Sequence, residues 1–255
     1  QSVTSATLRI TPAETIFNMK KKLGIIQSRG LGDLIIALPI ARWYADRDWD
    51  IYWPICEEFY PSMKDSVPWV KWIPIQTDPV GHFFYDVPME RLKNFKCDEI
   101  VCLYQALTNH PELSAEPYFQ ATKFDQYKYI KMGVPFTEKW NLARCIQRNP
   151  ERESGLYQLV VQNPNYCVLH LQGSDFAVDV DRSIIPADWQ QIEIGPQTDN
   201  IFDWLMVLEG AQSLIMVDSV FANLVDQLGI GEDRYFIQRS HIGLTPVHQG
   251  PWTWL

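Results

Sequence analysis

The segment Gly30-Leu31-Gly32-Asp33 joins two glycines to a carboxylate, between an apolar run and an apolar helix pattern. The glycines allow a tight turn and the close approach of a ligand, and the N-terminus of the following helix offers free N–H groups. Asp33 has two interpretations. It is either an N-cap, which the spacing alone favours, or a general base at the carboxyl ends of the strands, where α/β folds bind ligands. The spacing is not GxGxxG, so no dinucleotide fingerprint is indicated.

A second polar group, Asp218-Ser219, follows the apolar run 213–217 and precedes a helix pattern that contains Asn223. A carboxylate accepts hydrogen bonds from a ribose diol, and a hydroxyl and the helix N–H groups donate to phosphate. Both residues are also good helix caps. Composition leaves the two interpretations about even.

A third group, Gln172-Gly173-Ser174-Asp175, ends another apolar run and has the composition of a turn that wraps a phosphate. Arg182 would neutralise that phosphate, but it stands beside Asp179 and Asp181, so a local salt bridge is equally open. His170 lies within the apolar run and is better interpreted as a core histidine than as a catalyst.

Apolar runs and helix patterns alternate along the whole chain, which is typical of parallel sheets covered by helices. We expect strands at 23–26, 51–54, 70–75, 99–103, 166–171, 191–194, 213–217 and 235–237. We expect helices at 34–43, 89–95, 119–132, 202–211 and 220–228. The stretch 146–165 carries Asn-Pro pairs and a glycine and is predicted to be the linker between two halves, and the tail 246–255 is expected to pack on the surface or to cross back.

The chain has 255 residues, a formal net charge of −9, 46% hydrophobic residues and 21% charged residues, as a globular protein does. Phosphate contacts need clustered Lys and Arg, and the only basic run is Lys20–Lys22. A generic nucleic-acid binder is therefore not favoured.

The five cysteines form no CxxC pair and the histidines show no ligand spacing, so we expect reduced thiols, a cytoplasmic location and no metal. The longest apolar run, Leu34–Ile40, contains a proline and is too short to cross a bilayer, so no transmembrane segment is expected. Residues 1–18 lack a secretory pattern. If Met19 is the native start, residues 1–18 would be a leader or a cloning remnant.

In this order, the three groups resemble the heptosyltransferase-like family of GT-B glycosyltransferases, glycosyltransferase family 9. Members open with an apolar strand, a turn that ends in Gly-Asp and a helix with Leu-Pro, as Leu23–Ile26, Ser28–Asp33 and Leu38-Pro39 do here. Leu169–Ser174 is similar to the family's strand and turn that open the second half, and Met216–Leu224 to its Val-Asp-Ser/Thr-Gly stretch and helix.

The resemblance implies two Rossmann-like domains with parallel sheets facing a cleft, at 1–155 on the acceptor side and 156–255 on the nucleotide-sugar side. It implies inverting transfer of a sugar from a nucleotide-sugar to a hydroxyl of a glycan, a lipid-linked sugar or another acceptor, with no metal and no cofactor. Asp33 matches the family's base. The implied acceptor-side residues are Ser28, Arg29, Gly30 and Gly32, and the implied donor-side residues are Gly173, Ser174, Arg182, Asp218, Ser219 and Asn223.

Among the departures from the family, Val220 stands in place of a glycine and Asn223 in place of a histidine. Two alternatives therefore stay open beside the main hypothesis. One is a DNA-modifying glycosyltransferase that acts on hydroxymethylated bases, because small GT-B enzymes also glycosylate modified DNA. The other is a nucleotide- or sugar-binding module of the same fold without catalysis.

Overall fold

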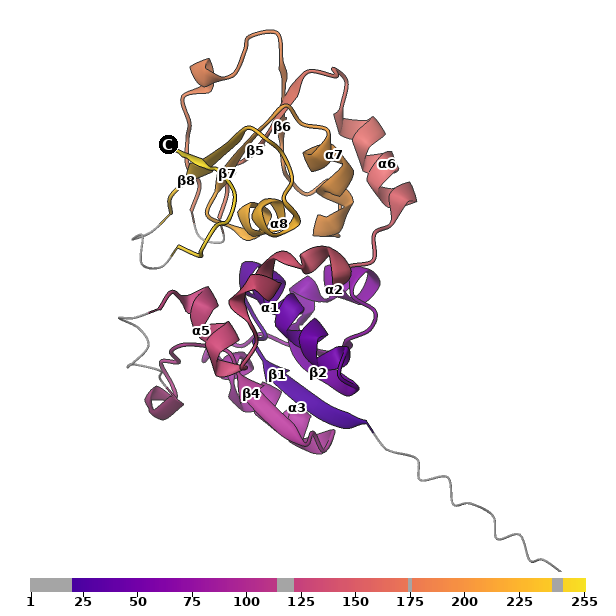
Figure 1. The fold of residues 1–255 in the computed structure, drawn as a ribbon, viewed down its shortest axis with the longest axis vertical. Coiled ribbons are helices and arrows are strands. Elements are labelled where there is room, and N and C mark those ends of the chain that lie inside the picture. The colour runs from indigo at the N-terminus through magenta and orange to yellow at the C-terminus, as the bar shows by residue number, and fades with distance from the viewer. Residues whose placement is uncertain (1–19, 114–121, 174–175, 240–244) are drawn as a thin grey trace, which may run out of the picture.

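The computed structural model describes residues 20–113, 122–173, 176–239 and 245–255, which form two α/β halves stacked end to end (Figure 1). The elements of the first half are β1 (Lys21–Ile26), α1 (Leu31–Ala45), β2 (Trp49–Cys56), α2 (Tyr60–Ser66), β3 (Lys71–Ile75), α3 (Asp86–Asn94), β4 (Glu99–Cys102) and α5 (Phe124–Lys131). Those that follow are α6 (Pro150–Val160), β5 (Tyr166–His170), β6 (Gln190–Glu193), α7 (Leu205–Glu209), β7 (Ser213–Val217), α8 (Val220–Leu228), β8 (Arg234–Ile237) and β9 (Thr253–Trp254).

Each half is built on its own parallel sheet. The first sheet has the order β3-β2-β1-β4 and the second has the order β6-β5-β7-β8-β9. Neighbouring strands run parallel in both. In each sheet the first strand along the chain, β1 or β5, is an inner strand, and the later strands are added on both sides of it. The strand order therefore reverses beside β1 and beside β5. The expectation of two Rossmann-like halves is confirmed.

Helix α1 is the central helix of the molecule. Its residues 34–41 are all buried. A helix that is apolar on every side packs against neighbouring elements on every side. It packs on β2 and α5 in the first half and on α8 in the second half. One hydrophobic core accordingly runs through both halves, from Leu23 on β1 to Phe236 on β8.

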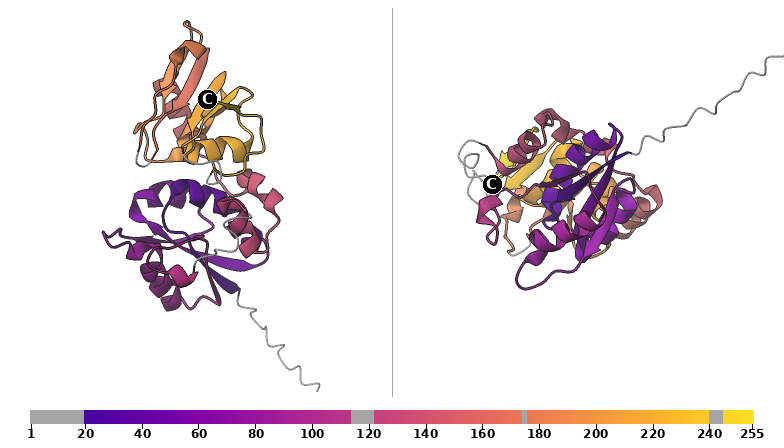
Figure 2. Two further views of the ribbon diagram at one scale, coloured as in Figure 1. Left: turned by 90° about the vertical axis from the view of Figure 1, so that its left-hand side faces the viewer. Right: turned by 90° about the horizontal axis from the view of Figure 1, so that it is seen from below.

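The two halves are also joined by polar contacts away from α1. The hydroxyl of Ser62 on α2 donates to the carbonyl oxygen of Asp199 at 2.9 Å, and the Asn200 amide donates to Ser66 Oγ at 3.0 Å. Figure 2 shows the two sheets from the side and from below. These contacts and the shared core fix the orientation of one half on the other.

Helix α6 occupies most of the stretch 146–165 that is predicted to be the linker between the two halves. Asn149 accepts a hydrogen bond from the Arg152 N–H at 3.1 Å and Pro150 opens the first turn, so the Asn-Pro pair is a helix start. Arg152 binds Asp203 at 2.8 Å, which joins α6 to the second half. The expected domain boundary at 155 therefore falls within a helix.

Most other expected elements are present with shifted ends. The predicted helix 119–132 corresponds to α5, with residues 119–121 outside the described part of the chain. The tail adds β9 as an edge strand beside β8. No helix in the described ranges is long and apolar enough to cross a membrane.

Candidate active site

The N-termini of α1 and α8, which follow β1 and β7, meet where the two halves join. A Cβ atom added to Gly32 would lie 3.4 Å from Asn223 Nδ2 and 3.7 Å from the backbone of Val220. These distances are ordinary van der Waals contacts, so the first turns of the two helices lie against each other at Gly32. This contact brings Asp33 close to the start of α8.

Asp33 lies in the first turn of α1, but it is not the cap. Gly30 is the N-cap residue and has φ 86°, a backbone conformation that glycine adopts readily. A Cβ on Gly30 would lie 2.6 Å from Asp33 Oδ2, so the carboxylate also needs a glycine there. The interpretation of Asp33 as an N-cap is therefore wrong. Its side chain is 34% exposed, which leaves it accessible to a ligand.

Lys128 holds the carboxylate of Asp33 in place. Its ammonium group lies 3.0 Å from Asp33 Oδ1 and donates to Gln27 Oε1 at 2.8 Å and to the Leu103 carbonyl oxygen at 3.1 Å. Lys128 is 2% exposed, so its charge is buried and almost fully satisfied by these three acceptors. The sequence did not predict this residue, because nothing in the pattern of α5 separates it from Lys131.

The rest of the turn supports Asp33. Ser28 is fully buried, and its hydroxyl donates to the carbonyl oxygen of Phe83. The Arg29 backbone N–H donates to the hydroxyl of Tyr104 at 3.0 Å, while its guanidinium pairs with Glu58 at 3.1 Å. Burial raises the pKa of Tyr104, so its phenol stays protonated. Ser28 and Arg29 thus bind the turn to the segments that follow β2, β3 and β4.

On the opposite side of the junction, Ser219 and His170 form a pair. His170 Nδ1 lies 2.9 Å from Ser219 Oγ, and the imidazole packs on Phe221 with ring centroids 4.8 Å apart. Burial lowers the pKa of His170 to about 4, so the ring is neutral at physiological pH. Ser219 is the N-cap residue of α8, but its side chain makes no cap hydrogen bond. Its hydroxyl is oriented by the neutral imidazole instead.

Asp218 and Asn223 surround this pair. Burial raises the pKa of Asp218, the neighbouring side chains of His248, Arg239 and Lys123 act to lower it, and Asp33 raises it further. The Asn223 amide donates to the Ser219 carbonyl oxygen at 2.9 Å, while its own oxygen Oδ1 is buried and has no hydrogen-bond partner. The junction thus gathers two carboxylates, a hydroxyl and several cationic side chains.

The third predicted group is only partly described. Gly173 donates its N–H to the Phe176 carbonyl oxygen at 2.9 Å, and Ser174 lies outside the described residues. Arg182 pairs with Glu193 and donates to Gln191 Oε1 at 2.8 Å in an exposed position. A local ion pair therefore engages Arg182, although its acid is neither Asp179 nor Asp181.

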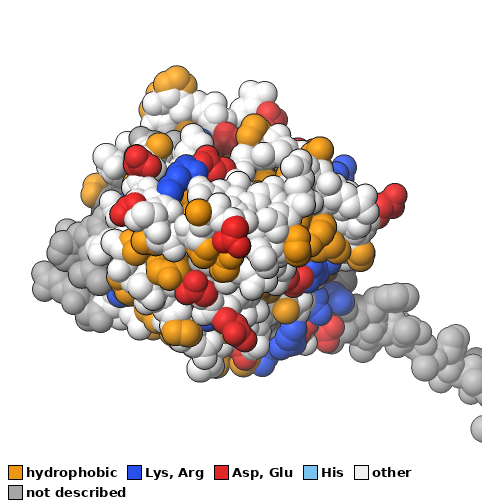
Figure 3. All heavy atoms as spheres, turned by 90° about the horizontal axis from the view of Figure 1, so that it is seen from above, with side chains coloured by type: hydrophobic (Ala, Val, Ile, Leu, Met, Phe, Trp, Pro, Cys, Tyr) orange, Lys and Arg blue, Asp and Glu red, His pale blue; other side chains and the backbone are white. Residues whose placement is uncertain are grey.

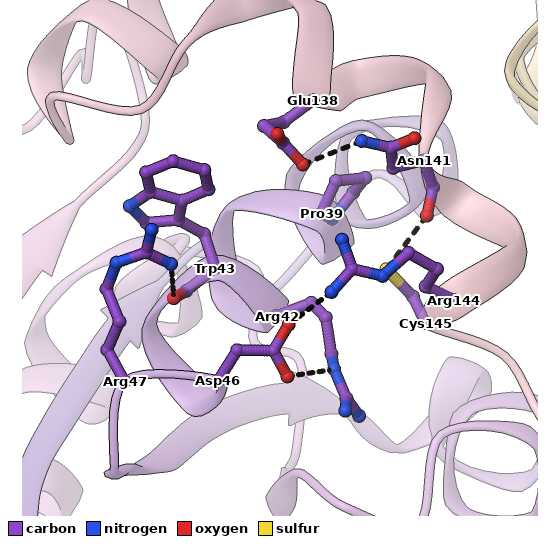
Figure 4. Close-up of a pocket in the computed structure, with 9 residues that line it drawn as sticks. All are labelled: Pro39, Arg42, Trp43, Asp46, Arg47, Glu138, Asn141, Arg144 and Cys145. Atoms are coloured by element: carbon purple, nitrogen blue, oxygen red, sulfur yellow. Dashed lines mark hydrogen bonds and ion pairs between the residues drawn. The ribbon is translucent and has the colours of Figure 1, made fainter.

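A separate hollow of about 180 Å³ lies near the far end of α1 (Figure 4). There Asp46 pairs with Arg42 at 2.8 Å and with Arg144 at 2.6 Å. Asp33 and Asp46 are about 20 Å apart at about 1.5 Å per helical residue. We interpret this hollow as the junction between α1 and the segment at Arg144, remote from the site at Asp33. Its lining residues are Pro39, Arg42, Trp43, Asp46, Arg47, Glu138, Asn141, Arg144 and Cys145.

No group of three or more His, Cys, Asp or Glu side chains within the described ranges has the arrangement of a metal site.

No protein-family model matches the chain, and no curated protein matches it. Among solved structures, the glycosyl transferase family 9 from Veillonella parvula superposes with a TM-score of 0.61 over 92% of this chain and 86% of that chain, at 12% identity.

Two Escherichia coli structures are similar over most of both chains at lower TM-scores. ADP-heptose LPS heptosyltransferase II gives 0.49 over 92% of this chain and 90% of its own at 10% identity, and heptosyltransferase WaaC with ADP gives 0.46 over 91% and 92% at 11% identity. The Veillonella structure confirms that this chain has the GT-B fold of family 9, as the three polar groups imply.

Proposed function

We propose that this protein is an inverting glycosyltransferase that moves a sugar from a nucleotide-sugar to an acceptor hydroxyl, with Asp33 as the general base. The observation that carries the proposal is the carboxylate of Asp33. It is held through Oδ1 by the buried Lys128, is partly exposed, and lies close to the start of α8 in the other half. A positioned base of this kind contributes about 10²–10⁴-fold to a rate.

In the proposed reaction, Asp33 takes the proton of the acceptor hydroxyl through Oδ2 while Lys128 retains Oδ1. The acceptor oxygen forms a bond to the anomeric carbon as the bond from that carbon to the diphosphate breaks. The nucleoside diphosphate leaves with the electron pair. Because the acceptor oxygen attacks from the face opposite the leaving diphosphate, the anomeric configuration inverts.

On the donor side, the free N–H groups of α8 and the hydroxyl of Ser219 are proposed to stabilise the charge on the leaving diphosphate. Asp218 would accept hydrogen bonds from the ribose or from the donor sugar. Gly173 would border the donor, and Ser174, which lies outside the described residues, is proposed as a donor-side residue on the resemblance alone. Arg182 would first have to leave Glu193, so we give it no part in the reaction.

The charge around the base turn does not favour DNA as the acceptor. Glu57 and Glu58 follow β2 directly beside the turn, since the Cys56 N–H donates to the Ser28 carbonyl oxygen at 2.9 Å. Phosphate groups would be repelled there. On the face shown in Figure 3, the described acidic and basic side chains are interspersed and form no broad basic surface.

The five cysteines are all free thiols, which supports a reducing compartment such as the cytoplasm.

Transfer without a metal ion is part of the proposal, because protein N–H groups and cationic side chains near α8 can replace a divalent ion at the diphosphate.

A thermal-shift screen tests the proposed function. The four common nucleoside diphosphates are added with and without EDTA, and the sugar conjugates of the nucleotide that binds are then assayed for transfer and hydrolysis. A ligand at about 100 times its Kd adds about 2.7 kcal/mol to the free energy of unfolding, so a binding nucleotide is readily detected. We expect one nucleotide to raise Tm in EDTA.

Failure of every nucleotide to raise Tm contradicts a donor site. A shift that vanishes in EDTA contradicts metal-independent binding. Binding of a nucleotide-sugar with neither transfer nor hydrolysis would favour the non-catalytic module.

A further inference from the structure

The segment 245–252, which we call the C-terminal strap, contacts α5 before it leads into β9. The Val247 N–H donates to Asp125 Oδ2 at 2.8 Å, and the Val247 carbonyl oxygen accepts a hydrogen bond from Lys139 Nζ. Asp125 lies in the first turn of α5, and Lys139 lies in the short 3₁₀ helix Phe136–Trp140. The strap is therefore bonded to a helix of the first half, although it ends in a strand of the second sheet.

Asp125 and Lys139 form an ion pair with no exposed surface. Lys139 Nζ lies 2.7 Å from Asp125 Oδ2, and both side chains are 0% exposed. Two charges taken out of water are tolerated only when their remaining hydrogen-bonding groups are also satisfied. The backbone of Val247 supplies a further partner to each charge. The pair thus recognises one position of the strap, which an apolar pair of similar size would not do.

Asp226 on α8 holds the other end of the strap, and its side chain is 1% exposed. Its Oδ1 accepts the backbone N–H of Gln249 at 3.0 Å and the indole N–H of Trp252 at 3.1 Å. Its Oδ2 accepts the indole N–H of Trp140 at 2.9 Å. Two buried carboxylates, Asp125 and Asp226, therefore fix the strap between α5 and α8.

Helix α5 links the strap to the proposed base. Asp125 and Lys128 are three residues apart, so they lie about one turn apart on the same side of the helix. Lys128 is the residue whose ammonium group lies 3.0 Å from Asp33 Oδ1. A continuous series of contacts accordingly runs from Asp226 on α8, through the strap and α5, to Asp33. The position of the base relative to α8 depends on this series.

We propose that the Asp125–Lys139 pair positions the base for the transfer, because by binding the strap it fixes α5 and Lys128 relative to the donor side on α8. This rests on the proposed function. Neither side chain touches a substrate or moves a proton. A base is effective only when it and the acceptor hydroxyl are in the reactive geometry, and a displacement of about 1 Å can lower a rate by about 10²-fold.

The test replaces both charges together, because removal of one would leave the other buried and unpaired. Asp125→Leu/Lys139→Met removes the hydrogen bonds to the strap. Asp125→Asn/Lys139→Met restores an amide that can bond the Val247 backbone without a charge. The matched control, Glu153→Leu/Arg148→Met, removes another buried carboxylate and its cation, which join α6 to α7.

Turnover of the nucleotide-sugar identified in the thermal-shift screen is measured as transfer or hydrolysis, and affinity for its nucleoside diphosphate by calorimetry. We expect Asp125→Leu/Lys139→Met to lower kcat about tenfold to hundredfold. Affinity for the diphosphate should stay within about twofold of the wild type, because the donor side on α8 is unchanged. Asp125→Asn/Lys139→Met should recover part of the lost kcat. The α6 control should keep the wild-type kcat even where its Tm falls.

The link from the strap to the base can also be measured without a substrate. Urea unfolding gives the unfolding equilibrium constants of Asp125→Leu/Lys139→Met, of Asp33→Asn and of the two changes combined. Independent sites multiply their effects to within about twofold. Because the strap holds Lys128 on Asp33, we expect the combined effect to differ from the product by more than that.

A wild-type kcat in folded Asp125→Leu/Lys139→Met overturns the inference. An equal loss of kcat in the α6 control also overturns it, because that result indicates a general loss of structure. If the wild type turns over no nucleotide-sugar, it is the proposed function that fails, and the unfolding measurement alone decides whether the strap is linked to Asp33.

A milder pair of variants covers the case in which Asp125→Leu/Lys139→Met does not fold. Trp252→Phe removes one N–H donor from Asp226 and keeps an aromatic ring. Its control is Trp72→Phe, which removes an indole hydrogen bond of 3.0 Å within the first half. We expect kcat to fall in Trp252→Phe and to stay at the wild-type value in Trp72→Phe. Equal kcat values in these two variants would overturn the inference.

Discussion

The strand–turn–helix units β1–α1 and β7–α8 look alike locally but hold their polar groups in different ways. Asp33 is anchored by a buried ammonium group, Lys128, which also bonds Gln27. Ser219 is anchored by a buried neutral imidazole, His170. We call the first the charged unit and the second the neutral unit, after the partner that holds Asp33 or Ser219.

This difference has a chemical consequence. A partner that binds one carboxylate oxygen fixes the orientation of the group, which suits a base that must be positioned against an acceptor hydroxyl. A neutral partner orients a hydroxyl without adding charge, which suits a group that donates a hydrogen bond to phosphate. It follows that changes in the first unit should affect both turnover and stability, while changes in the second should affect mainly pH dependence and binding.

The largest effect is expected from Asp33→Asn, which removes the base and preserves the shape of the side chain. Turnover should fall by about 10²–10⁴-fold, while affinity for the nucleoside diphosphate stays close to that of the wild type. Initial rates at saturating donor, with Tm and nucleotide binding as controls for folding, measure this. Normal turnover in a folded variant would contradict the role of Asp33.

The next effect is expected from Lys128→Met, which leaves Gln27 Oε1 and Asp33 without their buried donor. Removing one partner of a buried pair is strongly destabilising, but Asp33 is 34% exposed, so we expect a loss of about 1–3 kcal/mol in the free energy of unfolding. Urea unfolding measures it. The matched control is Lys131→Met on the exposed side of the same helix, which should change the value by less than about 0.5 kcal/mol.

A double-mutant cycle then shows whether the two groups are coupled. If the losses in the free energy of unfolding caused by Asp33→Asn and Lys128→Met simply add, the two side chains are not energetically coupled. This would contradict the ion pair that their 3.0 Å separation indicates.

The contrast between the two units also shows what the sequence could predict. Both strand–turn–helix units were predicted correctly, because apolar runs followed by small and polar residues are local signals. The residues that hold Asp33 and Ser219 in place were not predicted. Lys128 comes from α5, and His170 was interpreted as a core residue. His170 is of intermediate exposure rather than fully buried, and its bond to Ser219 could be known only from the pairing of β5 with β7.

Local signals also failed where one residue type serves two purposes. Asp33 was favoured as a cap, but the positive φ of Gly30 makes the glycine the cap residue and moves Asp33 into the first turn. The pair Asn149-Pro150 was interpreted as part of a linker, although the same pair starts a helix when apolar partners such as Leu156 can be buried. Tertiary burial decides such cases, and burial is a property of the fold rather than of the local sequence.

In the neutral unit, His170 should make stability depend on pH. Its folded-state pKa is about 4, below the ordinary 6.5, so between these values the unfolded chain binds a proton that the folded protein does not. The free energy of unfolding therefore falls as the pH is lowered through this window, by about 2 kcal/mol near pH 5 and by about 3 kcal/mol below pH 4.

Urea unfolding near pH 7 and near pH 5 measures this for the wild type, His170→Gln and the control His82→Gln. The glutamine at 170 can still hydrogen-bond to Ser219 but does not titrate. Between the two pH values, the free energy of unfolding of His170→Gln should therefore fall by about 2 kcal/mol less than that of the wild type. The variant His82→Gln, which replaces an exposed histidine, should show the same difference in the free energy of unfolding between the two pH values as the wild type. Equal pH dependence in the wild type and His170→Gln would contradict a buried neutral imidazole.

The smallest effect is expected from Ser219→Ala, which removes one hydroxyl from the neutral unit. A single neutral hydrogen bond contributes about 0.5–1.5 kcal/mol, so affinity for the nucleoside diphosphate should fall about two- to tenfold. Stability should change little, because His170 loses only one partner. Calorimetry with the diphosphate and with the nucleoside measures the effect, and only the diphosphate should be affected. If Ser219→Ala instead lowered turnover as much as Asp33→Asn does, Ser219 would take part in the chemical step, and the division between a charged catalytic unit and a neutral binding unit would be wrong.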